Sequence, residues 1–113
     1  MTGPDGIPSR YAVRTEKITR YLLSLEHPRG AAKARFFLAF GFSADRPAEM
    51  IDALAGHFID EAPSRLIAVP GRAQRIVFEG AIRSPDGRDP RVRSVWWIDA
   101  DGVAHFVTAV PLT

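Results

Sequence analysis

The chain has 113 residues, no cysteine and a formal net charge of +2. This length suits one domain with its own core, and the lack of cysteine excludes disulfides and thiolate metal sites. No apolar run approaches the roughly 20 residues that cross a bilayer, and residues 1–13 lack the apolar core of a secretory signal. These features predict a cytoplasmic protein without a membrane segment.

The positive charge is concentrated in two regions. Residues 1–35 hold seven Lys or Arg against three acids, and residues 62–93 hold seven Arg against three acids. Residues 36–61 hold one Arg against five acids. Thirteen of the fifteen basic residues are Arg, whose planar fork binds phosphate and carboxylate as Lys cannot. The bias suits a phosphate-bearing or acidic partner, although a GC-rich genome also explains it.

The N-terminal half predicts helices. Residues 1–14 contain Gly and Pro without apolar periodicity, which predicts a flexible arm before a single domain at 15–113. Apolar spacing and Pro or Gly stops then predict three helices, at about Thr15–His27, at about Ala31–Phe40, and from Ser43 or Asp45 to just before Pro63. The second helix is apolar nearly all round and should pack in the core. His57 in the third helix is expected at the rim of the core.

The C-terminal half alternates with the period of a β-strand. The expected strands are Ile76–Arg83, Val92–Asp99 and Val103–Val110, with a further edge strand at Arg65–Val69 in doubt. Helices followed by strands predict an α+β domain: three N-terminal helices, then a three- to four-stranded antiparallel meander sheet. We expect the second helix to cover one face of this sheet. Trp96 and Trp97 should face opposite sides, with Trp96 in the core.

No metal or cofactor motif is present. The three histidines, His27, His57 and His105, show no metal-ligand spacing. A glycine-rich phosphate loop and a nucleophile elbow are also missing. The sequence therefore predicts neither a metal nor a cofactor.

Basic and polar groups remain that can cleave RNA without a metal. His27 or His105 would move protons, and Lys33 with Arg83 or Arg93 would stabilise the phosphate. Thr108 would position the substrate. An exposed Trp97 would stack on a base.

Each of these candidates also has a structural reading. His27 can cap a helix end, and Lys33 can extend to the surface. His105, Thr108 and Trp97 can be ordinary strand residues. Arg83 and Arg93 lie near paired strand ends, so we expect their guanidinium groups to be close to each other, and acids of the same region can neutralise them. The acids in question are Glu79, Asp86 and Asp89.

One stretch resembles a known family. The segment from Tyr21 to Phe42 matches the pattern YLL-x(3)-HPxGxxKAxFF-x(3)-GF. This pattern is similar to that of an uncharacterised family of small bacterial domains, which end in strands resembling 95–98 and 106–111. Such domains occur alone or at the ends of toxin-like proteins, often beside a small partner gene. Their element order resembles the barnase/EndoU/colicin/RelE-like ribonucleases. The resemblance implies that His27, Lys33 and Thr108 are the first candidates for a site, and we expect the Lys33 ammonium to lie within a water bridge of the last strand near Thr108.

Two hypotheses follow. The first is a metal-independent endoribonuclease of a bacterial toxin-antitoxin type, with RNA as substrate and a small cognate protein as partner. The second is a non-catalytic protein-interaction domain. Convergence of His27, Lys33, Thr108 and an Arg on one open cleft would favour the enzyme. The sequence does not give the oligomeric state.

Overall fold

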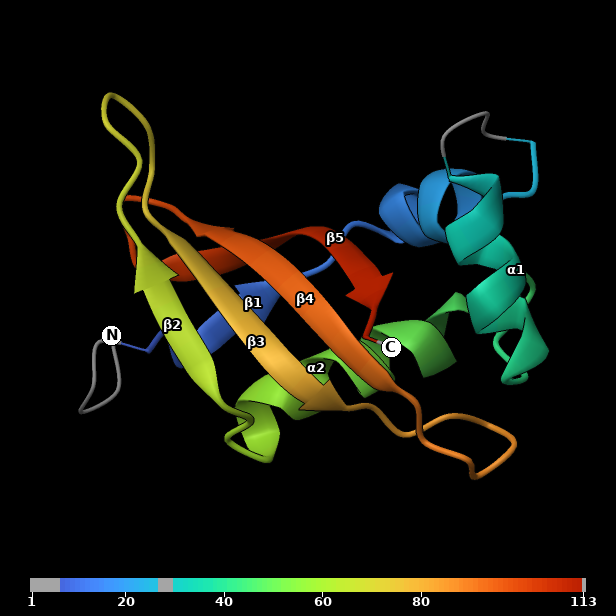
Figure 1. Ribbon diagram of the computed structural model, residues 1–113. Helices are drawn as coiled ribbons and strands as arrows, with labels where there is room; N and C mark the ends of the chain where they lie inside the picture. The colour runs from blue at the N-terminus through green and yellow to red at the C-terminus, as the bar shows by residue number, and fades with distance from the viewer. Residues whose placement is uncertain (1–6, 27–29, 113) are drawn as a thin grey trace.

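The computed structural model describes residues 7–26 and 30–112. Figure 1 shows their arrangement. Along the chain, the elements are β1 (Arg10–Ala12), the π-helix η1 (Lys17–Leu22), α1 (Ala31–Ala39), α2 (Pro47–Ile59), β2 (Ser64–Ile67), β3 (Arg75–Ala81), β4 (Arg91–Ile98) and β5 (Val103–Pro111).

The strands form one five-stranded sheet in the order β1-β5-β4-β3-β2. Strands β2 to β5 pair antiparallel, while β1 pairs parallel to β5. The predicted fold, three N-terminal helices followed by a three- to four-stranded antiparallel meander, was therefore wrong. A strand precedes the helices, and the sheet is mixed. Strand β1 was not predicted, because its three residues are too few to show the two-residue period of a strand. These residues also lie within the segment that was predicted to be a flexible arm.

Helix α2 covers one face of the sheet, which we call the inner face (Figure 1). Phe58 of α2 packs against Phe78 and Trp96, with ring centroids 4.5 and 4.8 Å away. Tyr11 of β1 stacks on the same ring at 4.8 Å. Trp96 is fully buried while Trp97 is 39% exposed, so the predicted opposition of the two tryptophans is confirmed.

Helix α1 does not cover the sheet, contrary to the expectation for the second helix. It lies with η1 beside the C-terminal end of β5 (Figure 1). Buried side chains such as Ala34 and Phe37 of α1 and Ile18 and Leu22 of η1 join the common core. The apolar pattern predicted correctly that this helix is buried, but it does not determine which part of the protein covers the helix. We call the face of the sheet opposite to α2 the outer face.

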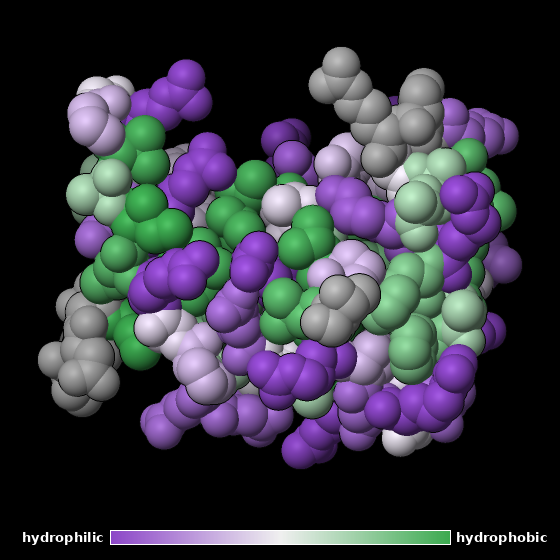
Figure 2. Space-filling model, in the orientation of Figure 1, coloured by the Kyte–Doolittle hydropathy of each residue, from purple (hydrophilic) through white to green (hydrophobic). Residues whose placement is uncertain are grey.

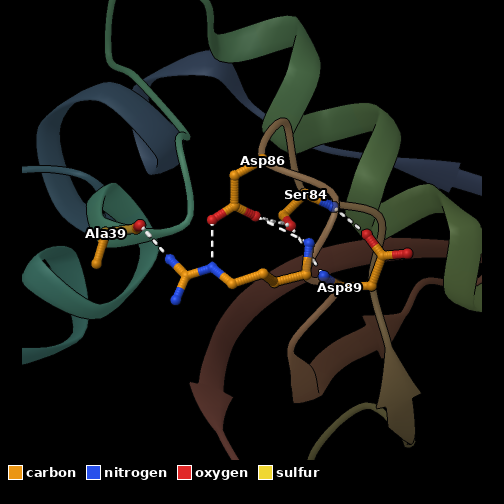
Figure 3. Close-up of polar contacts among 5 residues, drawn as sticks. Ala39, Ser84, Asp86 and Asp89 are labelled. Atoms are coloured by element: carbon orange, nitrogen blue, oxygen red, sulfur yellow. Dashed lines mark hydrogen bonds and ion pairs between the residues drawn. The ribbon is translucent and has the colours of Figure 1, made fainter.

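The loop between β3 and β4 is bound to the C-terminal end of α1 (Figure 3). Arg88 donates from Nη2 to the Ala39 carbonyl at 2.7 Å and from Nε to Asp86 at 2.6 Å. Its guanidinium lies 4.3 Å from the centre of the Phe40 ring. Gly41 ends the helix with φ +97°, and a Cβ there would meet Pro85 at 3.1 Å. The loop thus fixes the position of α1 beside the sheet.

Within the described part of the chain, every helix is too short or too polar to cross a membrane.

Candidate functional site

The outer face carries most of the polar and charged residues of β3, β4 and β5. Figure 2 shows hydrophilic side chains interleaved with hydrophobic ones on the face of the molecule turned to the viewer. A β-bulge shapes β5 here: Val95 of β4 pairs with Thr108, and the next residue, Trp96, pairs with Phe106. Val107 is therefore left without a partner on β4. Because of this extra residue, His105 and Thr108 both belong to the outer face although three positions separate them.

Lys33, Tyr21 and Thr108 form a hydrogen-bonded group that we call the lysine cluster. Lys33 of α1 donates from Nζ to Thr108 Oγ1 at 3.1 Å and to the Tyr21 hydroxyl at 3.3 Å. The residues come from α1, η1 and β5. The sequence predicted Lys33 beside Thr108, and this proximity is confirmed. Tyr21 belongs to the same motif but was not among the predicted site residues.

The lysine cluster holds a partly buried cation without a carboxylate. An ammonium group can donate three hydrogen bonds, and the two described acceptors of Lys33 are both hydroxyl groups. No acid among residues 7–26 and 30–112 lies within ion-pair distance of its Nζ. Such a cation favours the binding of an anion from outside the chain.

The ammonium acts on the ionisation of Tyr21. The hydrogen bond from Lys33 is the main cause that lowers the pKa of the Tyr21 phenol below its ordinary value of 10.0. Burial, the second-largest cause, opposes this shift, while the charges of Lys33 and Lys17 and a hydrogen bond with Thr108 lower the pKa further. A phenol with a lowered pKa is ionised in a larger fraction near neutral pH than an ordinary tyrosine, and its ionised form can accept a proton.

A cleft of about 680 Å³ adjoins the lysine cluster on the outer face. Its walls come from β1, the following turn, η1, β3, β4 and β5: Ala12, Arg14, Lys17, Arg75, Trp97, His105, Phe106 and Val107. A smaller hollow shares Arg14 and Lys17 with it and reaches Tyr21. Three cations thus line the cleft, and no acid is among its lining residues, although Glu16 lines the smaller hollow. The site is suited to a polyanion.

Trp97 and His105 form a stacked pair in this cleft. Their ring centroids are 4.3 Å apart and the rings are 17° from parallel. His105 binds Asp99 through Nε2 at 2.8 Å, and this hydrogen bond is the main cause that lowers the pKa of the Asp99 carboxyl. Asp99 also accepts hydrogen bonds from the backbone N–H groups of Asp101 and Val103. The imidazole is therefore held in one orientation.

The predicted pair of arginines does not form. Arg93 lies opposite Glu79 in the strand register and binds it, with Nε 2.7 Å from Oε2. Arg83 lies beyond the end of β3, in the wall of a different cavity that also contains Glu49 and Asp52. The prediction that the two guanidinium groups are close was wrong, because the register places Arg83 past Arg91 rather than beside Arg93. An acid neutralises Arg93 internally, as the structural reading allowed.

The chain has two further histidines, His27 and His57. His27 lies outside the described residues, so its role stays a prediction. His57 is fully buried on the inner face, so its expected place at the rim of the core was wrong. In the described part of the chain no three His, Asp or Glu residues are grouped as metal ligands would be.

Sequence reasoning missed the basic wall of the cleft. Arg14, Lys17 and Arg75 are far apart in the chain and lie in segments predicted as an arm, a helix and a loop or strand edge. They line one cleft because the parallel pairing of β1 with β5 brings the segment after β1 to the outer face of the sheet. The concentration of positive charge in residues 1–35 and 62–93 was the one available signal.

Comparison with solved structures finds the same fold. The chain is similar to a chain of a contact-dependent growth inhibition toxin–immunity protein complex from Klebsiella pneumoniae 342. The TM-score is 0.70 and the identity is 16%, over 88% of this chain and 98% of that chain. At this identity the likeness establishes the fold.

A family model described as "Domain of unknown function (DUF6883)" matches residues 6–113. Among curated proteins, none matches the chain.

Proposed function

The chain belongs to the DUF6883 family, and we propose that it is a metal-independent endoribonuclease of the toxin type. The lysine cluster is the proposed reaction centre. The observation that carries the proposal is the Lys33 ammonium, which donates to two hydroxyl groups and has no carboxylate among the described residues within ion-pair distance. One of these hydroxyl groups belongs to Tyr21, which lines the hollow that shares Arg14 and Lys17 with the cation-lined cleft. RNA supplies the phosphate that such a group binds.

The proposed reaction uses the substrate's own nucleophile. The ribose 2′-hydroxyl attacks the adjacent phosphorus and loses its proton to a base, while the bond from phosphorus to the 5′-oxygen breaks. A proton is delivered to that leaving oxygen, and the products are a 2′,3′-cyclic phosphate and a 5′-hydroxyl end. Lys33 stabilises the negative charge that develops on the phosphate. Thr108 positions it through its hydroxyl group.

We assign the two proton transfers, from the 2′-hydroxyl and to the 5′-oxygen, to two different residues. We assign the base to the Tyr21 phenolate, since Lys33 already favours its ionised form. His27, which precedes α1 in the chain, stays a prediction as the acid that protonates the leaving oxygen. We assign His105 to substrate binding instead of proton transfer, because three positions of β5 separate it from Thr108.

A small cognate protein is the proposed partner. The solved chain with the same fold comes from a toxin–immunity complex, in which two proteins are paired. By analogy, a partner that covers the cleft with acidic groups would neutralise its cations and block the substrate.

The experiment measures cleavage of labelled RNA by the purified chain in the presence of EDTA. We expect fragments with cyclic phosphate ends, and a rate that falls about 100-fold or more in Lys33→Ala. The matched control is Arg35→Ala, which removes an exposed cation from the same helix and should leave the rate unchanged.

Two outcomes would contradict the proposal. One is a folded protein that cleaves no RNA when freed of its partner. The other is equal loss of activity in Lys33→Ala and Arg35→Ala, since the lysine cluster would then have no particular role.

A further inference from the structure

We propose that the cleft binds an unpaired nucleotide of single-stranded RNA, with its base stacked on the Trp97–His105 pair. The inference deepens the proposed function and rests on it for the choice of RNA. It names a recognition subsite next to the reaction centre and a preference for unpaired over duplex substrate.

The strand register places the pair in a row across the outer face. Arg75 of β3 lies opposite Trp97 of β4, which lies opposite His105 of β5, which lies opposite Ala12 of β1. Ala12 is exposed and has only a methyl side chain. The row therefore offers two stacked aromatic rings with a small residue on the His105 side, and all four residues line the cleft.

Contacts within the protein hold the stacked pair in position. Trp97 keeps 39% of its surface exposed, while His105 is bound to Asp99 and stacked at 4.3 Å. A surface that is already ordered loses little conformational entropy on binding. Proteins that bind single strands commonly stack bases on such aromatic side chains.

The charges of the cleft suit a phosphate chain. Arg14, Lys17 and Arg75 lie around the aromatic pair, and none of them forms an ion pair with an acid of residues 7–26 or 30–112. Aromatic rings between cations are typical of grooves that follow a single strand. In a duplex the base faces are occupied by neighbouring bases, so this subsite requires an unpaired nucleotide.

The distance to the reaction centre fits an adjacent nucleotide. His105 and Thr108 are three positions apart on β5, which corresponds to roughly 10 Å along a regular strand. The bulge at Val107 shortens this path. A base on the aromatic pair and a phosphate on Lys33 can therefore belong to one short stretch of chain.

The test measures binding separately from cleavage. The probe is a fluorescein-labelled single-stranded RNA of about 12 nucleotides, methylated at every 2′-oxygen so that it cannot be cleaved, and its Kd is read by fluorescence anisotropy. We expect Trp97→Ala and Ala12→Leu each to weaken binding about tenfold. Trp97→Ala removes the stacking ring, whereas Ala12→Leu fills the space beside His105 without disturbing the core. Ala81→Leu, at an exposed position near the other end of the outer face, is the matched control and should bind like the unmodified protein.

The outcomes separate this inference from the proposed function. Unchanged binding by both Trp97→Ala and Ala12→Leu overturns the subsite, even if unmodified RNA is still cleaved. Binding that depends on Trp97 and Ala12 supports the subsite, even if no RNA is cleaved and the proposed reaction fails. Equal affinity for the corresponding duplex overturns the preference for unpaired RNA, and equal affinity for DNA of the same sequence overturns the choice of RNA.

Discussion

Two polar groups connect helices to the sheet, one on each face. On the outer side, the lysine cluster joins α1 and η1 to β5. On the inner side, His57 of α2 binds Ser94 of β4 at 2.6 Å and the Gly80 carbonyl of β3 at 3.1 Å. Trp96 donates to the same Ser94 hydroxyl at 2.9 Å. We call His57, Ser94 and Trp96 the histidine cluster.

The two clusters differ in how far their hydrogen bonds are satisfied internally. In the histidine cluster, Trp96 donates to Ser94, Ser94 donates to His57 Nδ1, and His57 donates from Nε2 to the Gly80 carbonyl. This chain of bonds leaves no polar atom of the cluster without a partner, and His57 and Ser94 are fully buried. The lysine cluster retains a charged donor next to an open cleft. A satisfied buried cluster stabilises a fold, whereas a cation with spare donors is available to a ligand.

The largest expected effect is on the outer side. Tyr21→Phe removes the proposed base and should lower RNA cleavage about 100-fold without a large change in melting temperature. The rate of the unmodified protein should rise with pH up to a Tyr21 pKa that lies below 10.0, and this rise should be absent in the variant. The chain has one other tyrosine, Tyr11, which packs on Phe58 of the inner side. Tyr11→Phe is therefore the matched control, and a similar loss in it would contradict the assignment.

The second effect is on the inner side and concerns stability. His57→Ala leaves the Ser94 O–H without its acceptor, removes the hydrogen bond to the Gly80 carbonyl and opens a cavity in the core. We expect the free energy of unfolding to fall by about 2–4 kcal/mol, measured by urea denaturation. His105→Ala, on the outer face, should cost less than about 1 kcal/mol. Equal losses in the two variants would remove the distinction between the clusters.

The third effect is the dependence of stability on pH. Burial is the main cause that lowers the pKa of His57 below its ordinary value of 6.5. As the pH falls below 6.5, the unfolded chain takes up a proton at His57 before the folded protein does, so stability falls. It falls by at most about 1.4 kcal/mol per pH unit for one group, until the pH reaches the lowered pKa in the folded state.

A substitution can test whether His57 causes this decrease in the free energy of unfolding below pH 6.5. His57→Gln should remove the decrease just below pH 6.5 while leaving any decrease at lower pH. Asp99 acts in that lower range, because its lowered pKa makes its contribution disappear only as the pH falls through values below 3.8. A slope just below pH 6.5 that persists in His57→Gln would show that another group is responsible.

The smallest effect is local. Arg88→Ala removes the hydrogen bond to the Ala39 carbonyl and the contact with Phe40. Amide hydrogen exchange in the last turn of α1 should become about five- to tenfold faster, with little change in α2. Arg72→Ala, in an exposed turn between β2 and β3, serves as the control. Unchanged exchange would show that the loop does not hold α1 in place.

The sequence predicted those parts that depend on local pattern. The three antiparallel strands β3, β4 and β5 followed from alternation, and Lys33 beside Thr108 followed from the family motif. The pattern could not predict β1, because its pairing with β5 is parallel and joins residues over 90 positions apart. Without β1, the cations near it could not be assigned to the cleft.

Misplaced residues have equally specific reasons. His57 occupies a helix position that looks like a core rim, and its burial depends on Ser94 and Gly80 from two separate strands. The predicted proximity of Arg83 and Arg93 was wrong, because the residue that lies opposite Arg93 depends on the strand register, which the sequence does not determine. Glu79, and not Arg83, lies opposite Arg93.

The bulge at Val107 has an evolutionary consequence. It divides β5 into a first half, which carries His105, and a second half, which carries Thr108. A residue in a bulge can be gained or lost without turning the flanking side chains to the other face of the sheet. The two halves can therefore tolerate substitution independently. A substitution at His105, before the bulge, can alter the aromatic pair with Trp97 while the contact between Lys33 and Thr108 stays in place.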